Sequence, residues 1–274
     1  MLTSKNLTIH KSNELVWLSF PKLDKAGVKC AFTTRIGGVS QGCLGTMNMS
    51  LSNGDNIQNV KENYRRICGA VGIDCNRLVF SKQTHTTNVR IVTSEDVGKG
   101  LNAERNYDNV DGLVTNLRGV GLVTHFADCV PLLFCDPVEQ VIAASHSGWR
   151  GTAGQIGAVT VQKMTEHFGC SPNNIIAAIG PCIKQCCYEV DLPVYEQFKN
   201  IEGLDISAFT KQTDDTHFML DLCEANRQIL VNAGIKSKNI DISDICTCCN
   251  SNLLHSHRAS GGKRGIMAAI IALD

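Results

Sequence analysis

Residues 121–151 read GLVTHFADCVPLLFCDPVEQVIAASHSGWRG. They contain three short apolar segments, at residues 121–126, 130–134 and 141–145, which we predict to be β-strands. Because these segments are apolar at successive positions, both faces of their sheet are expected to be covered. The third segment leads into His146 and a glycine-rich turn, which is a common place for functional groups in proteins that mix strands and helices.

Similar patterns on either side of this stretch predict the remaining elements. Further strands are expected at residues 28–34, 78–80, 89–93, 112–115, 175–179 and 267–273. Helices are expected at residues 57–70 after a cap at Asp55, from the capping box Thr152-Ala153-Gly154-Gln155 to about residue 168, and from Asp221 to Gly234. Strands and helices are mixed without a strict βαβ order, so we predict an α+β fold, a layered α/β sandwich. No linker divides the chain, and we expect one catalytic domain over residues 1–274.

The composition excludes several classes of protein. The 274 residues are 43% hydrophobic and 19% charged, which is typical of a soluble globular protein. Acidic and basic residues balance at 26 each without a basic stripe, which argues against a nucleic-acid partner. The chain shows neither a signal-peptide pattern nor an apolar stretch that could span a membrane. We therefore expect a cytoplasmic protein, with most of its 14 cysteines reduced and buried.

Three short segments supply a possible metal site. They are Gln83-Thr84-His85, Ala127-Asp128-Cys129 and the turn that begins at His146. Two imidazoles and one thiolate suit a borderline-soft metal such as zinc, and three protein ligands leave a fourth position open for chemistry. Taken singly, His85 could be a surface histidine and Cys129 an inert buried thiol. Asp128 is either a carboxylate that orients a ligand, or a strand-end cap.

The turn after His146 also predicts an anion site. Backbone N–H groups at a helix N-terminus attract anions, and Arg150 adds a permanent planar charge. Arg35 is a second candidate ligand for an anion, although it could equally be a solvated turn arginine. Trp149 could stack on a flat ligand or simply pack against the protein.

A second group of possible zinc ligands lies late in the chain. It comprises Cys246, Cys248, Cys249, His255 and His257, with Cys182, Cys186 and Cys187 as potential helpers. Its spacing fits neither standard paired C-x2-C pattern, so we interpret these residues as ordinary thiols and histidines. The alternative is a non-enzymatic zinc protein that binds more than one ion per chain.

With these segments identified, nearly the whole chain resembles the YfiH-type family. Members of that family are described as polyphenol oxidase (laccase)-like proteins and as purine nucleoside phosphorylases. The shared motifs, in chain order, are Phe32-Thr33-Thr34-Arg35 with Gly37-Gly38-Val39-Ser40, Asn48, Gly54-Asp55, Glu62-Asn63, Gln83-Thr84-His85, Asp111-Gly112, Ala127-Asp128-Cys129-Val130-Pro131, His146 to Thr152, Ile179-Gly180-Pro181-Cys182-Ile183, Asp221-Leu222, Cys246-Thr247 and Ser256-His257-Arg258. The chain departs from the common pattern at Tyr64, Thr86, Ser147, Ala259 and Ile266, none of which belongs to the metal triad.

The resemblance implies both a fold and an activity. The implied fold is a layered sandwich with mixed sheets covered by helices, shared with the catalytic domain of a bacterial deamidating toxin. The implied activity is zinc-dependent phosphorolysis of adenosine, inosine and methylthioadenosine, together with deamination of adenosine. Zinc would be held by His85, Cys129 and His146. Deamination also needs an acid that protonates the departing ammonia, and Asp128 and Asp111 are the candidate catalytic residues for this step.

The resemblance also implies partners and leaves alternatives. The expected partners are a purine nucleoside and phosphate, bound through Arg35, Asn48, Trp149 and Arg150, with neither nucleic acid nor membrane involved. Copper is the alternative metal, because two histidines and a cysteine can also form a blue-copper centre. A multicopper oxidase needs many histidines, whereas this chain has 8, and only His255 and His257 form an H-x-H pair.

Overall fold

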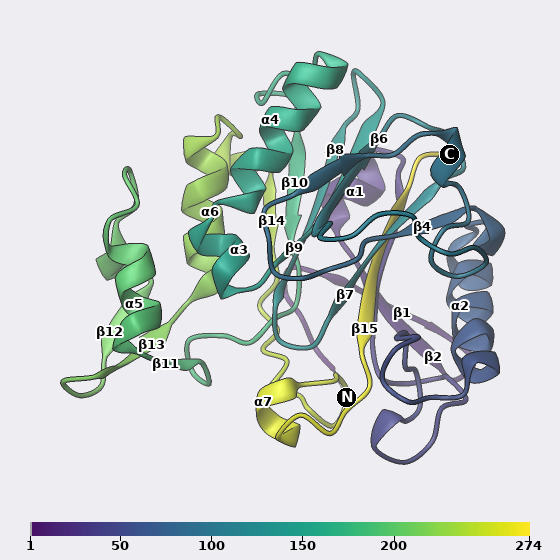
Figure 1. Cartoon of the computed structure of the whole chain (residues 1–274), viewed down its shortest axis with the longest axis horizontal. Helices are drawn as coiled ribbons and strands as arrows, with labels where there is room; N and C mark the ends of the chain where they lie inside the picture. The colour runs from purple at the N-terminus through teal and green to yellow at the C-terminus, as the bar shows by residue number, and fades with distance from the viewer. Residues whose placement is uncertain (1) are drawn as a thin grey trace.

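Two six-stranded sheets form the centre of the molecule in a computed structural model that describes residues 2–274 (Figure 1). The first sheet has the strand order β1 (Thr8–Ser12), β2 (Leu15–Ser19), β3 (Lys29–Thr33), β15 (Met267–Ala272), β7 (Gly121–Phe126), β4 (Leu78–Phe80). The second has the order β14 (Ile240–Ile242), β10 (Ile176–Ile179), β8 (Val130–Asp136), β9 (Val141–Ser147), β6 (Gly112–Thr115), β5 (Val89–Ile91). Both sheets are mixed, since β4 pairs with β7, β5 with β6 and β10 with β14 in parallel.

The helices cover the outer faces of these sheets. Helix α2 (Ile57–Val71) packs on the first sheet, and α4 (Ile156–Phe168) and α6 (Leu222–Asn232) pack on the second (Figure 1). A small third sheet of β11 (Glu189–Asp191), β13 (His217–Leu220) and β12 (Thr210–Gln212) lies beside α5 (Leu192–Lys199). The remaining helices are short: α1 (Pro21–Lys25), α3 (Trp149–Ala153) and α7 (His257–Ser260).

Three apolar clusters fill the spaces between these layers. The cluster between the two large sheets contains Phe32 and Leu122 from the first sheet and Leu133 and Ile142 from the second. Because side chains alternate along a strand, the neighbouring residues point outward and need helices to cover them. All seven residues of β8 and of β9 are buried, which explains why these segments are apolar throughout. The predicted layered α+β fold is confirmed.

The predicted helix from residue 152 to 168 is wrong at its start. The chain forms α3 first, then breaks at Gly154 and Gln155, and only then begins α4. Gln155 adopts a left-handed conformation with φ 58°, and its side chain makes no capping hydrogen bond. The Thr152 hydroxyl donates to Gly148 O instead of capping α4. The turn after His146 therefore continues into a separate five-residue helix.

The other predicted helix boundaries agree closely with the structure. Asn56, not Asp55, is the N-cap of α2, because its side chain accepts a hydrogen bond from the Gln58 N–H. Gly72 ends α2 in the left-handed conformation that favours glycine. Asp221 caps α6 as expected. Among residues 2–274, none of the helices is long and apolar enough to cross a membrane.

Candidate metal centre and its cavity

The structure brings His85, Cys129 and His146 together. One ligand atom from each lies within 4.8 Å of the ligand atoms of the other two. The two imidazole rings meet edge to face, with centroids 4.8 Å apart. His146 is buried, Cys129 is half-buried and His85 is exposed, so the cluster faces solvent on one side. This is the arrangement expected of a three-ligand metal site with an accessible fourth position.

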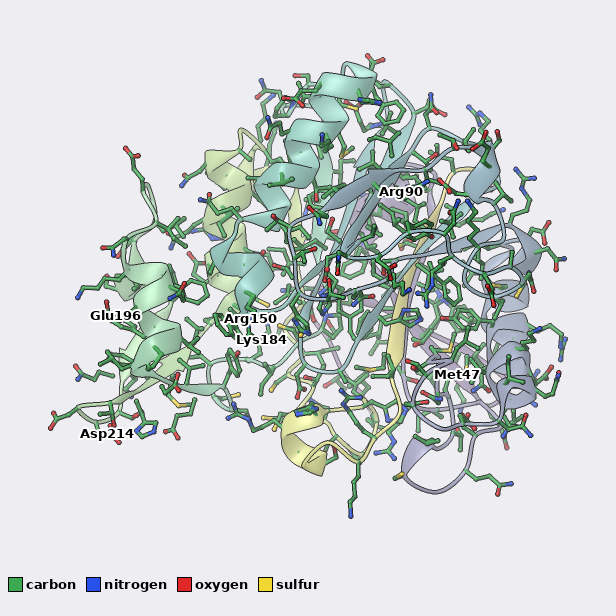
Figure 2. All side chains as sticks on the ribbon, viewed as in Figure 1. Met47, Arg90, Arg150, Lys184, Glu196 and Asp214 are labelled. Atoms are coloured by element: carbon green, nitrogen blue, oxygen red, sulfur yellow. The ribbon has the colours of Figure 1, made fainter. Side chains whose placement is uncertain are left out.

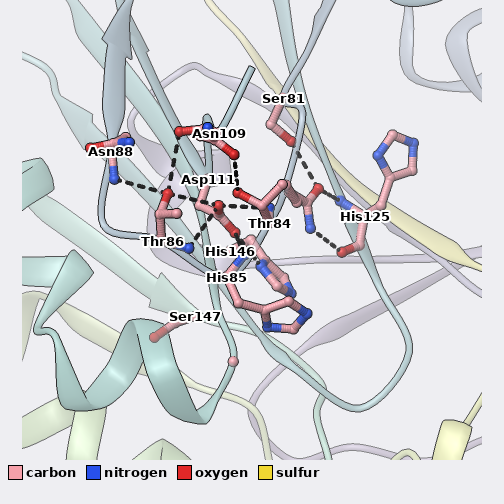
Figure 3. Close-up of polar contacts among 12 residues, drawn as sticks. Ser81, Thr84, His85, Thr86, Asn88, Asn109, Asp111, His125, His146 and Ser147 are labelled. Carbon is pink, nitrogen blue, oxygen red and sulfur yellow. Dashed lines mark hydrogen bonds and ion pairs between the residues drawn. The ribbon is translucent and has the colours of Figure 1, made fainter.

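Asp111 holds the loop that carries His85 (Figure 3). Its carboxylate accepts hydrogen bonds from the backbone N–H groups of Thr84, His85 and Thr86, at 2.9, 3.0 and 3.0 Å. His85 has a left-handed backbone with φ 63°, which is uncommon for a residue other than glycine, and these bonds stabilise it. The same carboxylate lies 2.9 Å from Nδ1 of His146. One buried aspartate therefore positions both histidines.

The contact between Asp111 and His146 fixes which ring nitrogen is free. A proton on Nδ1 bonded to the carboxylate leaves Nε2 available as a metal ligand, the arrangement common among zinc-binding histidines. Burial acts to raise the pKa of Asp111, but the hydrogen bonds from His146, Thr84 and Thr86 lower it to about 2. Asp111 is therefore ionised at neutral pH.

Cys129 lies where the chain passes from β7 to β8. Asp128, just before it, has φ 91°, so the turn is tight and strained. Pairing of Pro131 with His146 in neighbouring strands brings Cys129 beside the histidine. Gly148 makes room for the cluster, since a Cβ atom there would lie 2.7 Å from Nδ1 of His85 and 3.1 Å from the sulfur of Cys129.

Asp128 is an anchor for the late part of the chain, which revises its expected catalytic role. Its carboxylate accepts hydrogen bonds from the Thr247 and Ser256 hydroxyls at 2.6 and 3.0 Å and from the Arg258 N–H at 2.7 Å. Both carboxylate oxygens are therefore engaged, although the residue lines the cavity. These bonds fix two loops against the strained turn that carries Cys129.

A cavity of about 730 Å³ opens over the cluster. This volume is within the usual range for small-molecule sites. Its walls contain the three proposed ligands and two kinds of side chain suited to a nucleotide-like molecule. The aromatic residues are Phe80, Phe126, Trp149 and Tyr188, and the residues that can carry positive charge are Lys82, Arg105, His125, His257, Arg258 and Arg264.

Two of the predicted substrate-binding residues, Arg35 and Asn48, are tied up in loop contacts outside this cavity. Arg35 donates to the backbone oxygens of Gly45 and Ser251 and borders a separate, smaller hollow. Asn48 is fully buried; it donates to Asn53 and accepts a hydrogen bond from the distant Ile266 N–H. Both residues are structural because their polar atoms are used to hold loops.

Trp149 and Arg150 take different positions at the start of α3. Trp149 lines the cavity, as expected. Arg150 is exposed near the start of α3 (Figure 2). Its guanidinium lies over the Trp149 ring, 4.1 Å from the centroid. Arg150 therefore packs against Trp149 instead of lining the cavity, a position that does not suit a direct phosphate ligand.

Sequence reasoning missed most of the cationic residues of the cavity. Arg264 is the most informative: within residues 2–274 its buried Nε atom has no hydrogen-bond partner. Its Nη2 atom lies 3.3 Å from Nδ1 of His257. Burial, the largest influence, lowers the pKa of Arg264. A basic residue in the segment Gly261-Gly262-Lys263-Arg264 could have drawn attention to this loop, but no spacing linked it to the metal triad.

Comparisons with known proteins identify the relatives of this chain. A family model described as multi-copper polyphenol oxidoreductase laccase matches residues 29–274. The chain is 39% identical to the purine nucleoside phosphorylase YlmD of Bacillus subtilis (strain 168) over 252 residues, which cover 90% of this chain and 88% of that protein. It is 33% identical to the adenosine deaminase RL5 of an unknown prokaryotic organism, over 92% of this chain and 96% of that protein.

A solved structure supports the same relationship. The crystal structure of the hypothetical protein YfiH of Bacillus licheniformis superimposes with a TM-score of 0.92 at 33% identity. The match covers 97% of this chain and 99% of that one. The likeness extends over nearly the entire layered fold.

Proposed function

The chain belongs to the family described as multi-copper polyphenol oxidoreductase laccase, and on this premise we propose that it is a metal-dependent enzyme that acts on purine nucleosides. We treat residues 1–274 as one catalytic unit. The observation that carries the proposal is the convergence of two imidazoles and a thiol beneath a cavity lined by aromatic and cationic side chains. Relatives named purine nucleoside phosphorylase and adenosine deaminase support this class of substrate.

Zinc is the metal that suits the site best. One thiolate and two imidazoles are common zinc donors, and the Asp111–His146 pair supplies the outer hydrogen bond that orients such a ligand. His85, Cys129 and His146 would hold the ion. Zinc bound there supplies a Lewis acid with one position open to a reactant.

Arg264 and His257 are our candidates for the phosphate site. Arg264 lines the cavity, and its buried Nε atom has no hydrogen-bond partner among residues 2–274, which is costly for a charged donor. His257 lies against the same guanidinium and lines the same cavity. An arginine fork recognises phosphate oxygens well because its N–H groups match their geometry.

The aromatic walls support binding of a flat heterocycle. Trp149 and Tyr188 both line the cavity, and an arginine lies over the ring of each, with Arg150 at 4.1 Å and Arg258 at 5.4 Å from the ring centroids. Such stacks hold each ring in place. A purine base between these walls would lie near the metal cluster.

Phosphorolysis is the reaction that this arrangement favours. A phosphate oxygen forms a bond to C1′ of the ribose while the bond from C1′ to the base nitrogen breaks. The electron pair leaves with the purine, which takes the proton that hydrogen phosphate carried. Arg264 and His257 orient the phosphate nucleophile toward C1′. The products are a free purine base and ribose 1-phosphate.

Deamination is the second candidate activity, favoured by the relative named adenosine deaminase. Water would add at C6 of adenosine, and ammonia would leave to give inosine. This reaction needs the metal cluster but not the phosphate site. The two activities are therefore separable through Arg264.

Incubation of the purified protein with adenosine, with and without phosphate, tests the proposal. Chromatography should reveal adenine only when phosphate is present, whereas inosine in both samples would indicate deamination. Cys129→Ala should abolish turnover, and Cys43→Ala, at an exposed cysteine outside the cavity, should not. Circular dichroism of each variant checks that it is folded. Full activity of folded Cys129→Ala protein would overturn the proposal.

Metal analysis addresses the oxidase alternative. A copper enzyme that oxidises phenols would contain copper and absorb strongly in the visible range. The nucleoside enzyme should contain zinc and be colourless. Oxidation of a phenol by copper-loaded protein, without any turnover of nucleoside, would favour the oxidase.

A further inference from the structure

Four cysteines outside the metal centre converge from two distant loops. Cys186 and Cys187 lie between β10 and β11, and Cys246 and Cys249 follow β14. Their sulfur atoms all lie within 4.8 Å of one another. Three of the distances are 3.8 Å between Cys186 and Cys187, 3.6 Å between Cys186 and Cys249, and 3.4 Å between Cys187 and Cys249.

These distances fit the edges of a zinc–thiolate tetrahedron. With Zn–S bonds of about 2.3 Å, neighbouring sulfurs of such a site are about 3.8 Å apart. A disulfide needs about 2.05 Å between its sulfurs. Small side-chain rotations would complete the tetrahedron, whereas a disulfide would pair two thiols and leave the other two unused.

We propose that Cys186, Cys187, Cys246 and Cys249 bind a second metal ion, a zinc held by four thiolates. A site with four protein ligands has no open position, so this ion is structural and not catalytic. Soft thiolate ligands select zinc over magnesium, calcium or manganese. The site is independent of the proposed nucleoside activity, because it shares no ligand with the first cluster.

The backbone of both loops is already shaped for this role. Cys246 and Cys249 have the C-x2-C spacing typical of zinc sites, and the turn between them is closed by a hydrogen bond from Asn250 N to Cys246 O. Across the gap, the Lys184 N–H donates to the sulfur of Cys246 at 3.5 Å. Sequence reasoning considered these cysteines as possible zinc ligands but favoured ordinary thiols, because the other half of the site is an adjacent Cys-Cys pair instead of a second C-x2-C.

His255 and His257, the other late candidates, do not join this cluster. His255 is 1% exposed and borders the smaller hollow, while His257 lines the main cavity. Cys248 lies next to Cys249 in sequence but is not among the four mutually close ligands. Cys248 therefore provides a matched control.

The proposed ion would fasten two walls of the main cavity. Tyr188 follows the Cys186–Cys187 pair directly, and Arg258 belongs to the segment that follows Cys249. Arg258 donates to the backbone oxygen of Cys187 at 3.2 Å, so the two walls already touch beside the cluster. Zinc at this position would hold the walls together by four strong bonds.

Metal content of the full chain tests the proposal. The wild-type protein, purified under reducing conditions and without chelator, should carry one more zinc per chain than the Cys186→Ser/Cys249→Ser variant. Cys248→Ser should retain the wild-type content. Equal zinc content in the wild type and the double variant would overturn the proposal.

A second measurement avoids reliance on variants that could fail to fold. The wild-type protein reconstituted with ¹¹³Cd should give two resonances by nuclear magnetic resonance. One should lie in the far-downfield region characteristic of coordination by four thiolates, and the other at the higher field expected for mixed sulfur and nitrogen ligands. A spectrum without the four-thiolate resonance would refute the second site.

Discussion

Replacement of Asp111 by asparagine should weaken metal binding without removing any metal ligand. The carboxylate of Asp111 accepts bonds from three consecutive backbone N–H groups, from the Thr86 hydroxyl and from Nδ1 of His146. An asparagine has the same shape but only one acceptor oxygen, and its NH2 group would face donors. Both histidine ligands would lose their fixed orientation.

The expected size of the effect follows from the number of donors affected. Loss of an outer hydrogen bond to a metal-bound histidine typically reduces metal affinity 10–100-fold, or about 1.4–2.7 kcal/mol. Backbone N–H groups left without an acceptor cost about 1–3 kcal/mol each. We therefore expect Asp111→Asn to lower the free energy of unfolding by about 3 kcal/mol and zinc affinity by at least tenfold.

Competition with a coloured chelator measures the zinc affinity, and urea denaturation measures the stability. Asp108→Asn is the matched control, because Asp108 is a nearby exposed aspartate that pairs with Lys82 on the surface. Exposed ion pairs contribute at most about 1 kcal/mol, so this variant should keep wild-type affinity. Zinc affinity of folded Asp111→Asn protein within twofold of wild type would refute the anchoring role of Asp111.

Four further predictions concern the phosphate site, two glycines and a buried aspartate. Arg264→Ala should raise the KM for phosphate at least tenfold in the phosphorolysis assay, whereas Lys263→Ala should not; equal values would exclude Arg264 as a phosphate ligand. Gly148→Ala should weaken zinc binding in the chelator assay, because the added Cβ would collide with His85 and Cys129; unchanged zinc affinity would refute this. Gly69→Ala, on the open surface of α2, should raise the free energy of unfolding by up to about 1 kcal/mol in urea denaturation, and a loss of stability would refute this. Burial acts to raise the pKa of Asp96, but hydrogen bonds from Arg90 and Lys99 lower it below the ordinary value. The stabilisation that ionised Asp96 provides is therefore present above a pH of about 3.9 and is lost as the pH falls below it. Asp96→Asn should lower the free energy of unfolding by about 3 kcal/mol at pH 7 and by less in acid. A difference between variant and wild type that does not change with pH in urea denaturation would contradict this.

The strands were predictable because their signal is local. The segments expected at residues 78–80, 112–115 and 121–126 coincide with β4, β6 and β7. The buried strands β8 and β9 extend two residues further than expected, so that His146 lies inside β9 and not beyond it. Strands β11 and β12 were not predicted, because three-residue strands with mostly exposed side chains leave no periodic pattern.

The partners of the metal triad were harder to predict because they act through tertiary contacts. Asp111 bonds to residues 25–27 and 35 positions away, and no sequence pattern links an aspartate with backbone N–H groups at such a separation. Arg35 and Arg264 look alike in sequence, because each is an arginine within two residues of a glycine on its C-terminal side. Only the fold reveals the difference: Arg35 donates hydrogen bonds to backbone oxygens, whereas the Nε atom of Arg264 has no hydrogen-bond partner among residues 2–274.

The path of the chain between the two sheets explains why the cluster forms where it does. His85 lies in the connection from β4 of the first sheet to β5 of the second, and Cys129 lies in the connection from β7 of the first sheet to β8 of the second. His146 belongs to β9, which pairs with β8, so this histidine lies beside the β7–β8 connection that carries Cys129. Each crossing bends the backbone into a left-handed conformation, at His85 and at Asp128, and each is held by a buried carboxylate. The two strained crossings therefore carry two of the three ligands to the same point, and the aspartates hold these crossings in place.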